Sequence, residues 1–339
     1  MNSTIENSKV EQKLPRPQRK SNLARFLRAY GTQIGILVVF VLMWLFFIVS
    51  APRTFLSPQI YLAFMSTIPF FAIIALPLTM LVIAGEMDLS FPSIMAIGMV
   101  AFVTVFNPTG NVFLALLAAL LAGFLAGLLN GIIVVGIGLP SLVVTIGTQF
   151  FWRGAVLVLL GGKGHTLVAA RESFVYSLLV GKLGGIPMQM IWLVATAVVA
   201  WVLLNRHRFG ANIYVIGDNR QTAELMGINT ARTRMLMFAL VGMAAAFAGV
   251  LASLQVSFFW PSLGEGYLLS TLAAVFLGGT SVFGGVGTIL GTFIGSFIIG
   301  AIQAAIVAIG LTGFWTELIY GLIIILSVSM HAILRRRIE

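Results

Sequence analysis

Long apolar stretches separated by short polar segments cover most of this chain of 339 residues. Most of the stretches are close to the roughly 20 residues that an α-helix needs to cross a bilayer about 30 Å thick. The pattern therefore predicts an all-α, polytopic membrane protein with about ten transmembrane helices. We expect these spans at residues 33–51, 61–84, 90–106, 112–135, 140–160, 188–204, 235–256, 268–282, 286–309 and 315–334.

Prolines, glycines and other small residues predict that several spans are broken or tightly packed. Pro69 and Pro77 fall inside the second span, where a proline removes a helix hydrogen bond and kinks the axis. The eighth span runs into the glycine-rich segment 278–287, which suits broken backbone lining a cavity. Small residues in 122–127 and 242–249 predict a close approach of helix backbones.

The composition and the placement of charge agree with a membrane protein. Hydrophobic residues make up 59% of the chain and charged residues 9%, whereas a soluble domain carries about 25% charged residues. A soluble enzyme and a disordered chain are therefore excluded. The net charge of +10 arises mainly on one face of the ten-span layout, at Lys9, Lys13, Arg16, Arg19, Lys20, Arg25, Arg28, Arg206, Arg208, Arg220, Arg232, Arg234, Arg335, Arg336 and Arg337. Because basic residues gather on the cytoplasmic side, we expect a bacterial inner membrane protein with both termini cytoplasmic and no nucleic-acid partner.

This layout divides the chain into three parts. We expect residues 1–31 to form a cytoplasmic segment and residues 32–334 a transmembrane permease domain with a cytoplasmic loop at 205–234. Residues 335–339 would be the cytoplasmic C-terminus. The first part would end in a helix lying on the membrane surface, because its apolar positions share one helical face at Leu23, Phe26, Leu27 and Tyr30.

Recognisable catalytic motifs are missing from the sequence. It has no HExxH, GxSxG or phosphate-binding GxxxxGK[ST] motif and no cysteine. We therefore expect no catalysis, no metal and no cofactor in this chain, so ATP and Mg²⁺ would be bound by another subunit. An intramembrane enzyme is a weak alternative, because no nucleophile–base pair stands at helical spacing.

A polar motif, Gly85-Glu-Met-Asp-Leu-Ser90, lies at the expected cytoplasmic junction of the second and third spans. Acidic residues are costly in lipid, so they lie at the interface or face a cavity. Asp88 or Ser90 would cap the third span. Alternatively, Gly85, Asp88 and Ser90 contribute to the inner gate of a pathway.

The loop at 205–234 contains signals for a short helix. Asp218 and Gln221 have the spacing of a capping box, which predicts a helix over 219–226. Gly227 would supply the left-handed position that ends it, and Asn229 would cap the next span. The alternative is a solvated connector.

Polar or aromatic residues in and beside the spans are candidates for a substrate pathway. The outer loop 257–267 holds several aromatic residues, which suit either an interfacial belt or stacking against a sugar ring. Each polar candidate could instead make a hydrogen bond between helices. The candidates are Asn130, Gln149, Phe258, Trp260, Ser270 and Gln303.

Several short motifs follow one another in an order that resembles a known family. They include the motif at 85–90, Leu129-Asn-Gly131, Leu139-Pro-Ser141, Thr145-Ile-Gly-Thr148, Arg153-Gly154, Phe209-Gly210, Gly217-Asp-Asn219, Ala223-Glu-Leu-Met-Gly-Ile228, Ala273-Ala274, Leu277-Gly-Gly-Thr-Ser281 and Gly284-Gly285. From about residue 60 onwards, the chain resembles the ribose/galactose/xylose-type permease subunits of bacterial ATP-binding-cassette (ABC) importers.

The resemblance implies a subunit that imports a sugar or sugar-like polyol delivered by a periplasmic binding protein. It also implies two ATPase subunits and a second permease copy or a homologous permease. Residues 219–228 would form the coupling helix that sits in a groove of the ATPase. Asp218, Asn219, Ala223, Glu224, Gly227 and Ile228 are the matching coupling residues.

The chain departs from the family pattern at two places. Glu86-Met87 and Phe91-Pro92 replace residues that are usually Gly-Ile and Val-Gly, and Leu268-Leu-Ser270 replaces Glu-Leu-Asp. These departures weaken the inference of ribose as the substrate. The alternative function is an ion-coupled secondary transporter, but such carriers tend to hold acids in mid-membrane. Here only Glu317, near the outer end of the tenth span, is a candidate for a position within the membrane.

Overall fold

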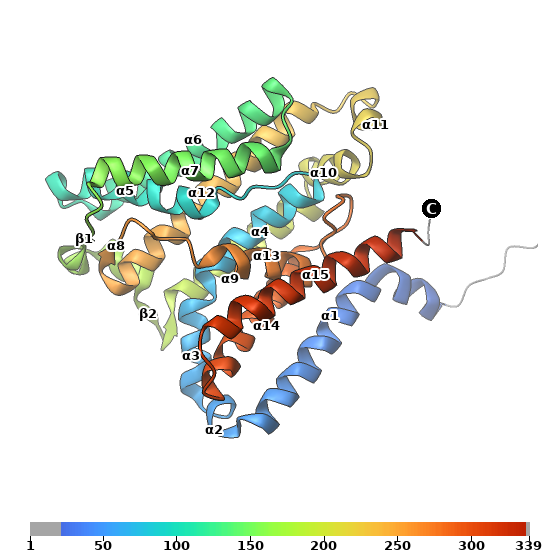
Figure 1. Cartoon of the computed structure of the whole chain (residues 1–339), viewed down its shortest axis with the longest axis horizontal. Coiled ribbons are helices and arrows are strands. Elements are labelled where there is room, and N and C mark those ends of the chain that lie inside the picture. Colours follow the sequence, from blue (N-terminus) through green and yellow to red (C-terminus); the bar gives the residue numbers. More distant parts are fainter. Residues whose placement is uncertain (1–21, 337–339) are drawn as a thin grey trace, which may run out of the picture.

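The computed structural model describes residues 22–336, without the side chains of residues 22–32, 331 and 334–336. The helices are α1 (Asn22–Ser50), α2 (Pro52–Phe55), α3 (Pro58–Thr67), α4 (Pro69–Ile83), α5 (Phe91–Thr109), α6 (Val112–Ile137), α7 (Ser141–Leu160), α8 (Phe174–Val180), α9 (Met188–Asn205), α10 (Arg208–Asp218), α11 (Arg220–Leu225), α12 (Thr230–Val256), α13 (Tyr267–Leu277), α14 (Ile289–Ala308) and α15 (Phe314–Arg336) (Figure 1). Strand β1 (His165–Thr166) pairs with β4 (Phe258–Phe259), and β2 (Lys182–Leu183) pairs with β3 (Ile186–Pro187). The all-α prediction is confirmed.

Each of the ten expected spans overlaps a helix, but the eighth, 268–282, is helical only to Leu277, and not every helix is long enough to cross a bilayer. Within the described residues, seven helices are sufficiently long and apolar, and α3 with α4 makes an eighth when counted as one bent span. The apolar helix α13 has 11 residues, about 16 Å at 1.5 Å per residue, so it crosses only part of a bilayer. Helix α15 is apolar over Phe314–Met330 and continues as helix to Arg336.

The expected break in the second span occurs at one of its two prolines. The axes of α3 and α4 differ by 51°, and Pro69 occupies the first turn of α4, where its missing N–H costs nothing. Pro77 lies inside α4 and does not end the helix. The reason is tertiary: every residue of α4 is buried, and α9, α12, α13 and α14 pack around it.

The N-terminal helix is continuous. Residues 22–50 form one helix, in which the expected first span follows residues 22–32 without a break. The side chains of Leu23, Phe26, Leu27 and Tyr30 lie outside the described residues, and so do residues 1–21 and 337–339. The predicted terminal segments therefore stay predictions.

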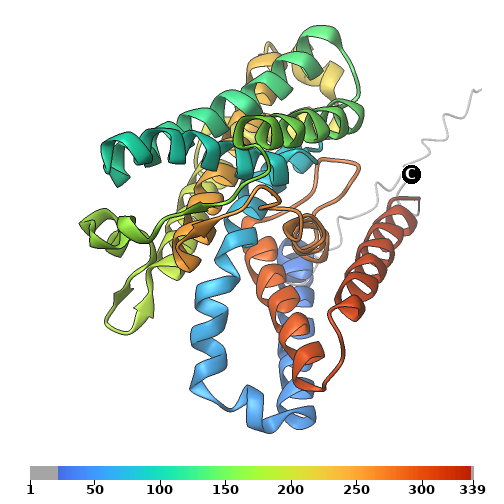
Figure 2. The same cartoon turned by 60° about the vertical axis from the view of Figure 1, so that its left-hand side comes forward.

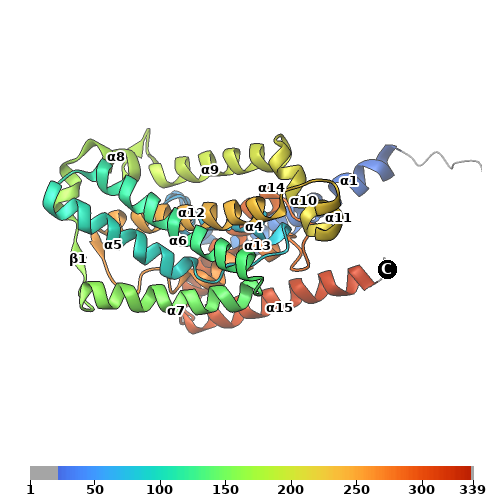
Figure 3. The same cartoon turned by 90° about the horizontal axis from the view of Figure 1, so that it is seen from above.

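Helix α12 runs through the middle of the bundle (Figure 3) and packs mainly against α6, α5 and α4. Glycines make the closest of these approaches. A Cβ atom on Gly127 of α6 would lie 2.2 Å from the Phe238 carbonyl oxygen of α12. The close packing predicted from the small residues is confirmed.

Two ends of the molecule differ in what they carry. The helix pair α10 and α11 lies at one end, whereas β1 and α8 lie at the other (Figures 1 and 3). The extended segment Gly85–Ser90 joins α4, which ends near α10, to α5. The segment Gly85–Ser90 therefore begins near the end of the molecule that carries α10 and α11.

Candidate functional site

A cavity of about 800 Å³ opens between α3, α4, α13, α14 and α15. Figure 2 shows α14 (orange-red) between α3 (blue) and α15 (red). Two of the six predicted pathway residues, Ser270 of α13 and Gln303 of α14, line the cavity. Tyr267, Glu265 and Glu317 contribute further polar groups. Hydroxyl, amide, carboxylate and aromatic groups therefore meet in a space large enough for a small polar solute.

The helix bend and a close helix contact shape this cavity. Ile68 lies at the junction of α3 and α4, and a Cβ on Gly300 of α14 would lie 2.5 Å from its side chain. The Tyr320 hydroxyl of α15 donates to the Ile299 carbonyl oxygen at 2.9 Å. These contacts hold α14 between the bend and α15.

The other four predicted pathway residues lie outside the cavity lining. Asn130 is buried in α6, and Gln149 is half-buried in α7. Phe258, which is exposed, and Trp260, which is half-buried, belong to the outer loop that follows α12. The structure thus brings together only two of the six candidates.

Arg153 of α7 organises that outer loop. Its guanidinium donates to the carbonyl oxygens of Pro261, Leu263 and Pro92, with lengths of 3.0 Å to Leu263 and 3.3 Å to Pro92. It also lies 3.4 Å from the Glu265 carboxylate at the cavity. Sequence reasoning did not select Arg153 as a site residue, although an arginine inside an apolar span is a signal for a specific partner.

The inner-junction motif forms a buried polar cluster. Asp88 accepts hydrogen bonds from the Ser90 amide at 2.7 Å and the Ser90 hydroxyl at 2.6 Å. Asn130 donates to the same hydroxyl at 2.7 Å. Gly85 begins the segment in a left-handed conformation, with φ of 82°. Asp88 therefore binds the amide of Ser90, the residue that precedes α5, but no side-chain hydrogen bond caps α5 itself. Asn130 belongs to this cluster.

The short helix predicted in the loop 205–234 is present, but a different residue caps it. The Asn219 side chain accepts from the Thr222 amide at 3.0 Å, whereas Asp218 is the last residue of α10. The predicted Asp218 cap is wrong because α10, an amphipathic helix that the sequence reasoning missed, extends through that position. Gly227 has a φ of 78°, as the predicted helix end requires.

The side chains of α11 divide between buried and exposed. Ala223 is buried, and its carbonyl oxygen accepts from the Ile228 amide at 3.0 Å. Leu225 and Met226 are 85% and 66% exposed. Asn229 accepts from the Arg232 amide at 2.9 Å, which confirms it as the cap of α12. The result is a short helix fixed at both ends with an apolar tip.

Glu224 ties α11 to the start of α12. It accepts from the Thr230 hydroxyl at 2.9 Å and from Arg220 at 3.1 Å. The hydrogen bond from Thr230, and to a lesser degree the one from Arg220, lowers the pKa of the Glu224 carboxyl below its ordinary value. The carboxylate is therefore ionised at neutral pH.

Helix α10 contacts the glycine-rich turn that joins α13 to α14. The Tyr214 hydroxyl donates to the Gly287 carbonyl oxygen at 2.8 Å, and burial raises the pKa of Tyr214. A Cβ on Gly217 would lie 1.7 Å from the Ile83 carbonyl oxygen, which accepts from the Gly285 amide at 2.9 Å. The end of α4, α10 and this turn therefore meet at one point, a relationship that local sequence patterns did not reveal.

A buried ion pair connects the inner junction to α12. Glu86 and Arg234 form it with side chains 12% and 5% exposed. A pocket of about 330 Å³ lies beside the pair, between the motif at 85–90, α6, α7 and Arg220. Each of the two residues is a charged group in a mostly apolar chain, which is a signal for a specific partner. The sequence does not indicate that they pair with each other, because they lie far apart along the chain.

The described residues offer little for binding a metal. Within residues 22–336, no group of three or more His, Asp or Glu side chains is arranged to hold a metal ion.

Comparisons with known proteins place the chain in a transporter family. Residues 60–328 match the family described as branched-chain amino acid transport system / permease component. The autoinducer 2 import system permease protein of Yersinia enterocolitica is 31% identical over 319 residues, which cover 90% of this chain and 94% of that protein. No solved structure matches the chain.

Two further relatives extend this result. The ribose import permease protein of Bacillus subtilis is 30% identical and covers 95% of this chain and 98% of its own length. A probable ABC transporter permease protein of Escherichia coli is 31% identical and covers 96% and 97%. The predicted resemblance is confirmed. With its polytopic helices, the chain therefore belongs to this family of transport-system permease components and is a permease subunit of an ABC importer.

Proposed function

We propose that this permease imports a sugar or sugar-like polyol through the cavity, driven by an ATPase docked on α11. The names of two relatives, permeases for ribose and for autoinducer 2, support the substrate class. The cavity supports it too, because Ser270, Gln303 and Tyr267 present groups that hydrogen-bond sugar hydroxyls. Phe258 and Trp260 would contact the solute earlier, at the outer loop, whereas Gln149 and Asn130 would act beyond the cavity.

The observation that carries the coupling part is the shape of α11. This helix is capped by Asn219, ends at Gly227 and exposes Leu225 and Met226. An exposed apolar tip suits a groove on a partner protein. Because both ends are fixed, a push on the tip moves α10 and α12 as rigid bodies. Asp218, Ala223, Glu224 and Ile228 complete this coupling segment.

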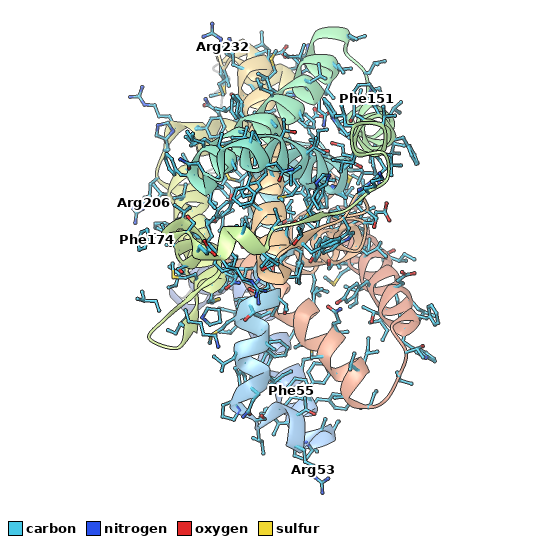
Figure 4. The ribbon with its side chains drawn as sticks, turned by 90° about the vertical axis from the view of Figure 1, so that its left-hand side faces the viewer. Arg53, Phe55, Phe151, Phe174, Arg206 and Arg232 are labelled. Atoms are coloured by element: carbon cyan, nitrogen blue, oxygen red, sulfur yellow. The ribbon has the colours of Figure 1, made fainter. Side chains whose placement is uncertain are left out.

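The partners and the orientation follow from the same proposal. ATP and Mg²⁺ would be bound by the ATPase, this chain would catalyse no reaction, and a periplasmic binding protein would dock on the outer loops. A second copy or a homologous permease would complete the pathway in the bacterial inner membrane. Both termini would be cytoplasmic, a prediction that rests on the basic residues of the loop 205–234, among them Arg206 and Arg232 (Figure 4).

The inner-junction motif would close the cytoplasmic end of the pathway. Gly85, Asp88 and Ser90 lie between α4 and α5, and their cluster includes Asn130. No observation favours the alternative of an ion-coupled carrier, and the family match supports an ATPase-driven importer.

Affinity purification tests the ATPase interface. We expect the tagged chain to bring down an ATPase subunit, and the double variant Leu225→Ser, Met226→Ser to lose most of it. Leu183→Ser is the matched control, because Leu183 is 65% exposed in β2 at the other end of the molecule. Full retention of the ATPase by the double variant would contradict docking on α11.

Gly227 provides a second test, directed at coupling rather than assembly. Its φ of 78° is strained for a β-branched residue, so Gly227→Val would distort the end of α11. We expect the variant to insert into membranes and to lose substrate-stimulated ATP hydrolysis in the assembled complex.

Panels of pentoses, hexoses and polyols would identify the substrate from the thermal shift of the cognate binding protein.

A further inference from the structure

Arg234 occupies a position between the two candidate switching segments. Its guanidinium pairs with Glu86, which belongs to the inner junction. Its charge also contributes, after the hydrogen bonds from Thr230 and Arg220, to the lowered pKa of Glu224 in α11. One arginine thus lies near a carboxylate of the inner junction and a carboxylate of the coupling segment.

The ion pair is poorly explained as a stabilising element. Nε and one terminal nitrogen of Arg234 are buried and have no hydrogen-bond partner within the described residues. Leaving buried donors of a charged group unsatisfied is costly, and apolar replacements of a buried ion pair are often as stable. Because these two donors are unused, Arg234 can also donate hydrogen bonds to a second carboxylate.

The surroundings of Arg234 leave room for its side chain to move and offer it a second carboxylate. The pocket of about 330 Å³ beside Arg234 also borders Arg220, the ion-pair partner of Glu224, and is lined by Leu139 and Leu142. Space and a second carboxylate are therefore both close to the pair. Because Glu224 accepts from Thr230, the first residue of α12, a movement of α11 displaces the part of α12 that carries Arg234.

We propose that Arg234 and Glu86 are positioning residues that transmit movement of α11 to the segment Gly85–Ser90. The inference rests on the proposed function, because it requires an ATPase to move α11. When α11 is displaced, the start of α12 carries Arg234 with it, and Arg234 moves Glu86. The next residues, Asp88 and Ser90, hold Asn130 of α6, so the displacement reaches the buried cluster.

The test uses the complete complex of the permease with its copurified ATPase. The chain has no cysteine, so Leu142→Cys gives a single thiol at the pocket. A water-soluble maleimide labels this thiol with and without ATP and orthovanadate. We expect trapping to change the labelling rate by about fivefold or more, the lower end of usual coupling factors.

Charge variants then separate coupling from folding. We expect Glu86→Gln and Arg234→Gln to abolish the nucleotide-dependent change while basal ATP hydrolysis continues. The exchange Glu86→Arg with Arg234→Glu should restore the change. Arg232→Gln is the matched control, since it removes an exposed charge from the same turn of α12 and should keep the response.

The other outcomes overturn the inference. A response that persists in both single variants, fails to return in the exchanged pair, or is absent from the parent complex contradicts it. Thermal denaturation and ATPase copurification of each variant show that a lost response does not reflect misfolding. Failure of any ATPase to copurify with the parent chain would instead contradict the proposed function itself.

Discussion

Gly123 of α6 and Gly242 of α12 face each other so closely that neither can carry a side chain. A Cβ on Gly123 would lie 2.4 Å from the Gly242 carbonyl oxygen, and a Cβ on Gly242 would lie 2.2 Å from that of Gly123. The obstacle on both sides is backbone, which cannot rotate away as a side chain can. This contact therefore sets the distance between the central helix and its main neighbour.

Alanine at position 123 should destabilise the fold. In an exposed helix interior, alanine in place of glycine gains up to about 1 kcal/mol. Here the clash should outweigh that gain, and overpacking usually costs about 1–3 kcal/mol. We expect Gly123→Ala to lower the unfolding temperature in detergent. Gly147→Ala in α7 is the control, because its added Cβ would meet no atom within 4 Å beyond its chain neighbours and the backbone of its own helix, and it should be neutral or stabilising.

Asn219 and Asp218 should differ sharply when each is replaced by alanine. Asn219→Ala removes the bond to the Thr222 amide and should cost about 1 kcal/mol of local stability in α11. Asp218→Ala leaves that bond intact. Amide hydrogen exchange at Thr222 distinguishes the two variants, and faster exchange in Asp218→Ala alone would show that the capping assignment is incorrect.

Arg153 should matter more for the outer loop than its ion pair does. In Arg153→Met, the Pro92, Pro261 and Leu263 carbonyl oxygens lose a donor. Each buried carbonyl that finds no new donor costs about 1–3 kcal/mol. We expect faster amide exchange across residues 258–266 and a lower unfolding temperature.

The ion pair of Arg153 offers a control for this prediction. Glu265 is 59% exposed, and exposed ion pairs contribute about 0–1 kcal/mol. Glu265→Gln should therefore leave exchange in the loop nearly unchanged. Equal effects of Glu265→Gln and Arg153→Met would indicate that the ion pair, not the carbonyl contacts, fixes the loop.

The sequence predicted those features that depend on local pattern. Apolar length located the spans, Pro69 located a bend, and Gly227 and Asn229 located the ends of α11 and the start of α12. These signals work because each reflects the backbone conformation of a few neighbouring residues. Asp218 misled the prediction because α10 extends through the position that the capping pattern marked.

Features made by distant residues could not be predicted in the same way. Glu86 and Arg234 are 148 residues apart in the sequence (234 − 86), and Tyr214 binds a backbone carbonyl that has no sequence signature. The pathway candidates show the same limit. Polarity selected Asn130 and Gln303 alike, but packing buried the first beside Ser90 and placed the second at the cavity. Tertiary geometry decides between a helix–helix hydrogen bond and a solute contact.

Filling the cavity should block import without disturbing the ATPase interface. Ala304 of α14 lines the cavity and is half-buried, so an indole there would occupy space that a solute needs. We expect Ala304→Trp to reduce uptake of the identified sugar by about tenfold or more, equivalent to about 1.4 kcal/mol. Ala195→Trp, at an exposed position of α9 outside the cavity lining, should transport normally. Uptake into vesicles holding equal amounts of each complex measures both, and unimpaired uptake by Ala304→Trp would show that the solute takes another route.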